Sequence, residues 1–168
     1  MKATFGPYSI SASKSLDRSE HLVKTSYSKK GYTADHVVTW ADMVFDAEFC
    51  GDIVGTVMMR LDSVNGLCAD AAYSHELDAL RISGRKLAEL SRFVIMPGQS
   101  TRSIMAALFH FVYVYSHLMN GVSDLICEVV PRHAAVQKRL LGFAQIAGPK
   151  RCERVGVDAV LLHRTLGI

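Results

Sequence analysis

One predicted strand carries two charged residues, Glu89 and Arg92, inside an otherwise largely apolar run from Leu87 to Ile95. An unpaired charge is costly to bury in a central strand, so a functional site explains both residues. The structural alternative is a Glu89–Arg92 ion pair or one exposed strand face. Residues three apart in a regular strand point to opposite faces, so a shared site would require a β-bulge, which is common beside active sites.

A second polar group follows this strand, where the chain enters a long predicted helix. Backbone N–H groups at a helix start, two hydroxyls and an arginine would suit a phosphate. The Gly-x-x-x-x-Gly-Lys-Ser/Thr pattern of a P-loop is absent, and either hydroxyl residue could instead be only a helix cap. The four residues of this turn are Gln99, Ser100, Thr101 and Arg102.

The cysteines and histidines form no recognisable metal or nucleophile motif. The four cysteines contain no Cys-x-x-Cys pair, which favours buried free thiols. His110 and His117 are seven residues apart, whereas a helical metal pair is typically four apart. His133 lies at the start of a predicted helix, where it could be a base, an anion contact or a solvated side chain. We therefore expect no metal.

Hydrophobic periodicity and turn residues predict a mixed sheet with helices on both faces. In such sheets, ligands bind where strand ends and helix starts converge. One expected helix begins at Asp17, with Glu20 as its capping partner. The expected strands are 8–12, 43–49, 52–59, 87–95, 124–130, 143–147 and 157–164, and the expected helices are 17–30, 76–85, 101–119 and 131–142, with loops at 33–42 and around the basic residues before 152.

The composition is that of one globular domain. The chain has 168 residues, of which 49% are hydrophobic and 21% charged, which excludes a disordered chain. No charge occurs between Arg102 and Asp124, but polar residues interrupt this stretch and its apolar residues fall on one helical face. We expect a buried amphipathic helix, not a membrane span, although the alternating aromatic residues at 109–115 also fit a strand. The first residues show no signal-peptide pattern, which indicates the cytoplasm.

The net charge of +3 is unevenly distributed along the chain. Residues 1–33 and 131–168 are basic, whereas residues 34–130 are acidic. Nucleic-acid-binding proteins usually show a stronger excess with clustered arginines. The pattern favours an acidic protein partner over nucleic acid.

Several segments together resemble a known family. The strongest are Ala88-Glu89-Leu90-Ser91-Arg92-Phe93, which matches a Glu-x-Ser-Arg-Phe motif, and Pro131-Arg132-His133 followed by Leu140-Leu141-Gly142-Phe143. The family is the long-chain N-acyl amino acid synthases, relatives of the acyl-homoserine-lactone (autoinducer) synthases within the GNAT acyltransferase fold. Weaker matches follow the same order along the chain: Tyr27, Gly31-Tyr32, Gly55-Thr56, 65–70, 76–81 and 149–152.

The resemblance implies a single GNAT-like domain over residues 1–168, of α/β (α+β) class, with a mostly antiparallel central sheet. The implied reaction moves a long fatty acyl group from acyl carrier protein, or from coenzyme A, to the α-amine of an amino acid. The acyl thioester is then a cosubstrate, and no further cofactor is expected.

The resemblance also implies roles for particular residues. Glu89 would be the general base, directly or through water. Arg92 would bind the acceptor carboxylate or orient Glu89. The strand residues Ser91, Arg92, Phe93, Val94 and Ile95 would bind substrate, with a backbone N–H on the thioester oxygen, and the 99–102 turn would bind phosphopantetheine. The expected docking residues for acidic acyl carrier protein are Arg132, Lys138, Arg139, Lys150 and Arg151.

The chain departs from its relatives at three places. Val130 and Gln137 occupy positions where relatives commonly carry asparagine and tyrosine, and Val23 or Lys24 replaces an early arginine. Two alternatives therefore stay open. One is an acyl-homoserine-lactone-type synthase with S-adenosylmethionine as acceptor, and the other is a non-catalytic module that binds acyl carrier protein or lipid.

Overall fold

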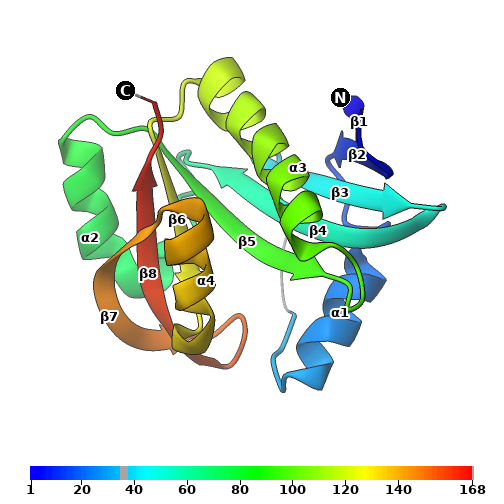
Figure 1. Ribbon diagram of the computed structural model, residues 1–168. Helices are drawn as coiled ribbons and strands as arrows, with labels where there is room; N and C mark the ends of the chain where they lie inside the picture. Colours follow the sequence, from blue (N-terminus) through cyan, green and yellow to red (C-terminus); the bar gives the residue numbers. More distant parts are fainter. Residues whose placement is uncertain (35–37, 168) are drawn as a thin grey trace.

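The computed structural model describes residues 1–34 and 38–167, in which eight strands form one sheet. Figure 1 shows the sheet crossing the molecule with helices packed against it. The elements in chain order are β1 (Lys2–Phe5), β2 (Tyr8–Ser13), α1 (Glu20–Lys29), β3 (Asp42–Phe49), β4 (Asp52–Leu61), α2 (Asp70–Ile82), β5 (Leu87–Ile95), α3 (Thr101–Tyr113), the π-helix η1 (Val114–Met119), β6 (Asp124–Val129), α4 (Pro131–Leu141), β7 (Ala144–Cys152) and β8 (Val157–Thr165).

The strand order is β1-β2-β3-β4-β5-β6-β8-β7, and only β5 and β6 pair in parallel. Their pairing covers Leu87–Leu90 against Asp124–Cys127, although β5 continues to Ile95 and β6 to Val129. The two strands therefore part after Leu90 and Cys127. Beyond that point, backbone groups that would otherwise bond across the sheet are left for a ligand.

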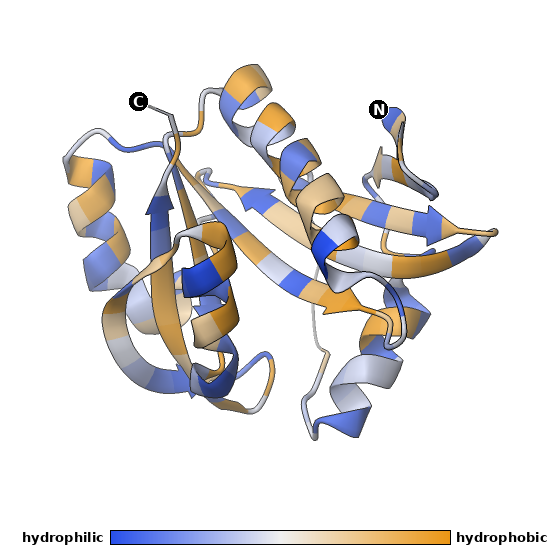
Figure 2. Ribbon diagram, in the orientation of Figure 1, coloured by the Kyte–Doolittle hydropathy of each residue, from blue (hydrophilic) through white to orange (hydrophobic). Residues whose placement is uncertain are grey.

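Alternate residues of β5 pack against different helices, as the period of a strand requires. Ala88 and Leu90 join the larger core cluster with residues of α3 and α4, whereas Leu87 packs with Tyr73 and Leu77 of α2. The sheet is thus covered on both sides, and α2 lies on the face opposite to α3 and α4. Figure 2 shows that each helix carries both hydrophobic and hydrophilic residues. This amphipathic pattern is typical of helices that cover a sheet.

The predicted order of elements from residue 8 onward is confirmed, including the hairpin between β3 and β4. Cys50 and Gly51 at its tip both have positive φ, 52° and 91°, as in a two-residue type I′ turn. The helix expected to reach residue 119 is also confirmed, but its last turn is the π-helix η1. No helix in the described part of the chain is long and apolar enough to cross a membrane.

Four details of the sequence prediction are wrong. Strand β1 was not expected, and α1 begins at Glu20 without the Asp17 cap, because the N–H groups of Ser19 and Glu20 already bond to the Leu16 carbonyl. Helix α2 begins at Asp70, whose carboxylate accepts the Leu67 N–H. The supposed basic loop before residue 152 belongs to β7, because it pairs with β8. Residues 35–37 of the predicted 33–42 loop lie outside the described residues.

Candidate active site

A β-bulge in β5 sets the orientation of Arg92. The register between β4 and β5 shifts so that Thr56 faces Val94 but Met58 faces Ser91, which leaves two residues of β5 opposite one of β4. Arg92 sits in this bulge with a φ of +53°. A non-glycine residue in this left-handed region is strained, and such strain is concentrated at functional sites. The sequence named a bulge only as the condition for a shared site of Glu89 and Arg92, and the structure has a bulge at Arg92.

The Arg92 guanidinium is buried and only partly bonded. The residue is 7% exposed, and its Nη1 donates a hydrogen bond of 3.1 Å to the Ala34 carbonyl. Its Nε and Nη2 have no hydrogen-bond partner among the described residues. Burial lowers the pKa of the guanidinium, although nearby Tyr27 and Glu20 act in the opposite direction. Because arginine stays charged in proteins, these free donors suit a carboxylate ligand.

Glu89 is not paired with Arg92, which excludes the Glu89–Arg92 ion pair considered from the sequence. The residue is 1% exposed, and its Oε2 accepts the Ala69 N–H at 3.1 Å. Its Oε1 accepts a hydrogen bond of 2.9 Å from Arg154. Burial raises the pKa of the Glu89 carboxyl group, and the attraction of Arg154 only partly offsets this. Glu89 is therefore a relatively basic carboxylate held at both oxygens.

Arg154 joins Glu89 to a second buried carboxylate, Glu128. The Arg154 Nη2 atom lies 2.9 Å from Oε1 of Glu89 and 2.9 Å from Oε1 of Glu128. The Glu128 side chain, on β6, is 4% exposed, and the Arg154 side chain, in the turn between β7 and β8, is 26% exposed. Sequence reasoning missed both. A charged residue in a mostly apolar strand was a signal for Glu128, but nothing local marked Arg154.

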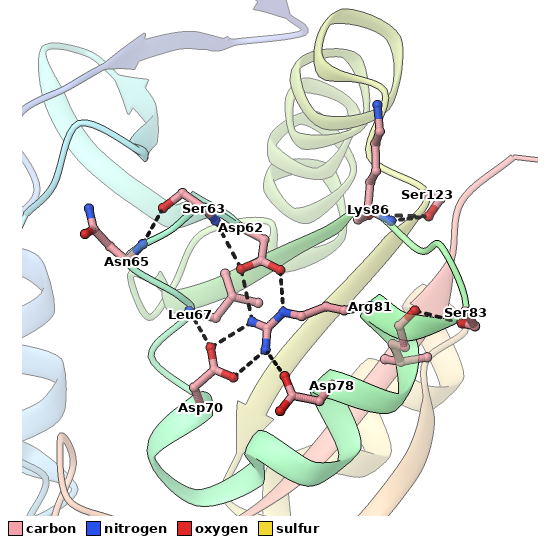
Figure 3. A network of polar contacts seen from close by, with 11 residues as sticks. Asp62, Ser63, Asn65, Leu67, Asp70, Asp78, Arg81, Ser83, Lys86 and Ser123 are labelled. Carbon is pink, nitrogen blue, oxygen red and sulfur yellow. Dashed lines mark hydrogen bonds and ion pairs between the residues drawn. The ribbon is translucent and has the colours of Figure 1, made fainter.

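A charge network on α2 fixes the loop that reaches Glu89. Figure 3 shows Arg81 surrounded by the carboxylates of Asp62, Asp70 and Asp78. Its Nε lies 2.7 Å from Asp62, and its Nη1 lies 2.7 Å from Asp70 and 2.9 Å from Asp78. Burial alone would raise the pKa of Asp70, but hydrogen bonds from Arg81 and the Leu67 N–H lower it. The network thus holds the segment that presents the Ala69 N–H to Glu89.

A cavity of about 340 Å³ opens where β5 and β6 part, bordered by α1, α3 and α4. All five predicted substrate-binding residues, Ser91 to Ile95, line it. Glu128 and Arg154 line it as well, whereas Glu89 is not among its lining residues. Arg154 therefore links Glu89 to the cavity, because it lines the cavity and donates a hydrogen bond to Glu89.

A second cavity of about 240 Å³ adjoins the first. Phe109, Leu141 and Phe143 line both cavities. The remaining lining residues of the second cavity are Tyr113, Leu125, Arg164 and Leu166. This mostly apolar space continues from the divided sheet into the layer between the sheet, α3 and α4.

The predicted phosphate turn lies at the start of α3. Thr101, the first residue of α3, lines the larger cavity. Gln99 is half-buried, while Ser100 and Arg102 are exposed. Ser100 occupies the N-cap position, but its hydroxyl bonds to Ser103 at 2.9 Å and does not cap the helix. The helix start therefore leaves N–H groups free of a side-chain cap next to the cavity.

The structure does not gather the five expected docking residues on one face. Arg132, Lys138 and Arg139 lie on α4. Lys150, on β7, instead bonds to Glu76 of α2 at 3.2 Å, and Arg151 lies 3.8 Å from Glu153. Arg132 stacks on the Tyr32 ring at the border of the larger cavity, with 5.4 Å between its Cζ and the ring centroid. Only the α4 group therefore lies along the helix that borders the cavity.

Two of the three departures from the resembling family, Val130 and Gln137, line the larger cavity, whereas Val23 and Lys24 do not. Val130 and Gln137 are both half-buried there, and Gln137 Oε1 has no hydrogen-bond partner among the described residues. His133 is nearby, and burial together with Lys30 and Arg132 lowers its pKa. His133 is therefore mostly neutral near pH 7.

The mixed sheet with its splayed parallel strands has the GNAT-like fold that the family resemblance implied. Two solved structures share the fold: an acyl-CoA N-acyltransferase from Pseudomonas aeruginosa (11% identity, TM-score 0.63, covering 92% of this chain and 97% of that one) and the AHL synthase LasI (18%, 0.62, 95% and 89%).

The chain belongs to the N-acyl amino acid synthase FeeM family, whose sequence profile matches residues 18–165. The structure of FeeM, an N-acyl amino acid synthase from uncultured soil microbes, is 26% identical, with a TM-score of 0.84 over 97% of this chain and 93% of that one. No curated protein matches the chain. The resemblance inferred from the sequence is thus confirmed, and the protein is an N-acyltransferase.

Proposed function

We propose that the protein acylates the α-amine of an amino acid with a long fatty acyl chain carried as a thioester on acyl carrier protein or coenzyme A. Membership in the FeeM family supports the reaction type. The observation that supports the acceptor is Arg92, a buried cation in the larger cavity with two nitrogens that bond to none of the described residues. A bidentate bond to an acceptor carboxylate would satisfy both.

Glu89 is the proposed general base. The acceptor ammonium must lose a proton before its nitrogen attacks the thioester carbon, after which the C–N bond forms, the C–S bond breaks and a thiolate leaves. The raised pKa of Glu89 suits it to take that proton. Because Glu89 does not line the cavity, we propose that a water molecule beside Arg154 relays the proton from the acceptor amine to Glu89.

The acyl thioester, which is the acyl donor, is proposed to lie in the opening between β5 and β6. Backbone N–H groups of β5 in the Phe93 to Ile95 segment, beyond its pairing with β6, would bond to the thioester oxygen. The phosphate of the pantetheine arm would meet the start of α3, at Gln99 to Arg102. A thiolate is a good leaving group, so Gln137 serves in place of tyrosine by donating an amide hydrogen bond and not a proton.

The two adjoining cavities support a long acyl chain. An apolar tail that passes Phe109 and Phe143 would fill the second cavity and remove apolar surface from water. The four thiols, which form no disulfide, suit a reducing compartment, and we place the enzyme in the cytoplasm.

An acidic acyl carrier protein would approach the basic residues of α4, Arg132, Lys138 and Arg139, beside the cavity. Charge reversal of Lys138 and Arg139 should weaken carrier binding, measured by calorimetry, without lowering thermal stability. Charge reversal of Lys150 provides the matched comparison, because this residue forms an ion pair with Glu76 of α2. Unchanged affinity after reversal of Lys138 and Arg139 would place the docking surface elsewhere, and an equal loss after reversal of Lys150 would contradict a surface confined to α4.

Mass spectrometry of lipid extracts from a bacterial host tests the function. We expect new N-acyl amino acids with the wild type, and their loss with Glu89→Gln and with Arg92→Ala. Acyl lactones would instead indicate an acyl-homoserine-lactone-type synthase with S-adenosylmethionine as acceptor. Carrier binding without any product would indicate a non-catalytic module.

A further inference from the structure

Glu128 lines the larger cavity, and one of its two carboxylate oxygens has no strong hydrogen-bond donor among the described residues. Its Oε1 is held by Arg154 at 2.9 Å, but its buried Oε2 has no hydrogen-bond partner among the described residues. The Cys152 thiol also donates to the Glu128 side chain, but a thiol is a weak donor, and burial together with Glu128 raises its pKa to about 11. A buried carboxylate oxygen in this state is costly unless a ligand donates to it.

The net negative charge around Glu128 favours the binding of a cation. Two buried carboxylates, Glu89 and Glu128, share the single guanidinium of Arg154. When both are ionised, the group carries one excess negative charge out of water, which is unfavourable. A ligand ammonium would neutralise it and donate to the free oxygen in the same contact.

Arg92 and Glu128 border the opening from opposite sides. Arg92 lies on β5 and Glu128 on β6, beyond the point where the strands part, and both line the larger cavity. Within the described part of the chain, two Arg92 nitrogens lack an acceptor and Glu128 Oε2 lacks a donor. An α-amino acid carries the matching pair, a carboxylate and an ammonium joined through one carbon.

We infer that Glu128 binds the α-ammonium group of the acceptor through Oε2, opposite the carboxylate on Arg92. This inference rests on the proposed function, because it assigns the acceptor subsite of the same reaction. Glu128 holds the amine at the cavity wall, and the proton released before attack passes toward Glu89. The two carboxylates thereby have separate tasks, binding for Glu128 and proton transfer for Glu89.

The test uses the amino acid that wild-type protein acylates fastest among the twenty standard ones, and its des-amino analogue, which keeps the carboxylate and side chain. Glu128→Gln keeps the shape but removes the charge. We expect its KM for the amino acid to rise about 10- to 100-fold, the range for a lost hydrogen bond between buried charges. The inhibition constant of the des-amino acid should stay unchanged, because that analogue has no ammonium.

Two comparison variants separate binding from other effects. Glu153→Gln makes the same change at an exposed glutamate in the same turn as Arg154 and should leave both constants unchanged. Glu89→Gln should lower kcat far more than it raises KM. An unchanged KM in Glu128→Gln, or an equal loss of affinity for the amino acid and the des-amino acid, would overturn the assignment.

A measurement on the wild type covers the case in which Glu128→Gln does not fold. The amino acid should then bind wild-type protein at least about tenfold more tightly than its des-amino analogue, as measured by calorimetry. Equal affinities would overturn the role of Glu128 while leaving the proposed function intact. Failure of the wild type to acylate any of the twenty amino acids would overturn the proposed function and this inference together.

Discussion

Replacing Arg154 by methionine would leave two buried carboxylates without their cation. The Glu89 and Glu128 side chains are 1% and 4% exposed, so neither charge can be solvated in place. Breaking a buried ion pair from one side costs about 3–5 kcal/mol. Because Arg154 itself is 26% exposed, we expect the lower end of this range, about 3 kcal/mol near pH 8. For a chain of this size, that lowers Tm by about 6–12 °C.

The destabilisation should depend on pH with a definite sign. Burial already raises the pKa of Glu89 above its unfolded value, and removal of Arg154 raises it further. A carboxyl group with a raised folded pKa favours folding below its unfolded pKa, about 4.3, and this contribution is lost as the pH rises through the folded pKa. The stability gap between Arg154→Met and the wild type should therefore be largest at pH 8 and shrink toward pH 5.

Urea denaturation at a series of pH values measures this gap. Arg151→Met is the control, because Arg151 is exposed and lies 3.8 Å from an exposed glutamate, and it should change stability little at any pH. Adding Glu89→Gln to Arg154→Met should restore part of the lost stability at pH 8, since one buried charge is removed. A gap that is the same at pH 8 and pH 5, or no recovery in the double variant, would refute the reasoning.

Substitutions at three positions probe other parts of the site and fold. Arg92→Gly should have a free energy of unfolding in urea about 0.5–1 kcal/mol higher than that of Arg92→Ala, because glycine tolerates the φ of +53°. Neither variant should acylate amino acids. A more stable alanine variant would contradict backbone strain at the bulge. Arg81→Lys keeps the charge but not the forked geometry, so we expect a loss of about 1–2 kcal/mol and a lower kcat; unchanged kcat would separate the network from Glu89. Gly55→Ala should cost about 1–3 kcal/mol in thermal unfolding, because its Cβ would lie 2.6 Å from the Ile104 Cγ2 atom, whereas Gly148→Ala meets no atom within 4 Å and serves as the control.

Most of the local structure follows from short-range sequence patterns. Apolar periodicity and turn residues located β2 to β8 and the four α-helices, because these patterns depend on residues close together in the chain. The start of α1 escaped prediction, since it depends on which groups already bond to its first N–H groups, and the strand character of 148–151 depends on pairing with β8. The cost of charge in a strand marked Glu89 and Arg92, and the ordered motifs indicated the family.

The assembly of the site depends on contacts between residues far apart in the chain. Arg154 is 65 residues from Glu89 and 26 from Glu128, and the partner of a buried charge over such separations is set by strand order and not by local pattern. The separation of β5 and β6, which opens the cavity, also depends on the tertiary structure, as does the ion pair of Lys150 with Glu76 of α2. The sequence thus marked charged residues in apolar strands, while the packing of the sheet determined which of these residues form ion pairs. Burial removes the charges from water only when the chain has folded, so their pairing becomes necessary only then.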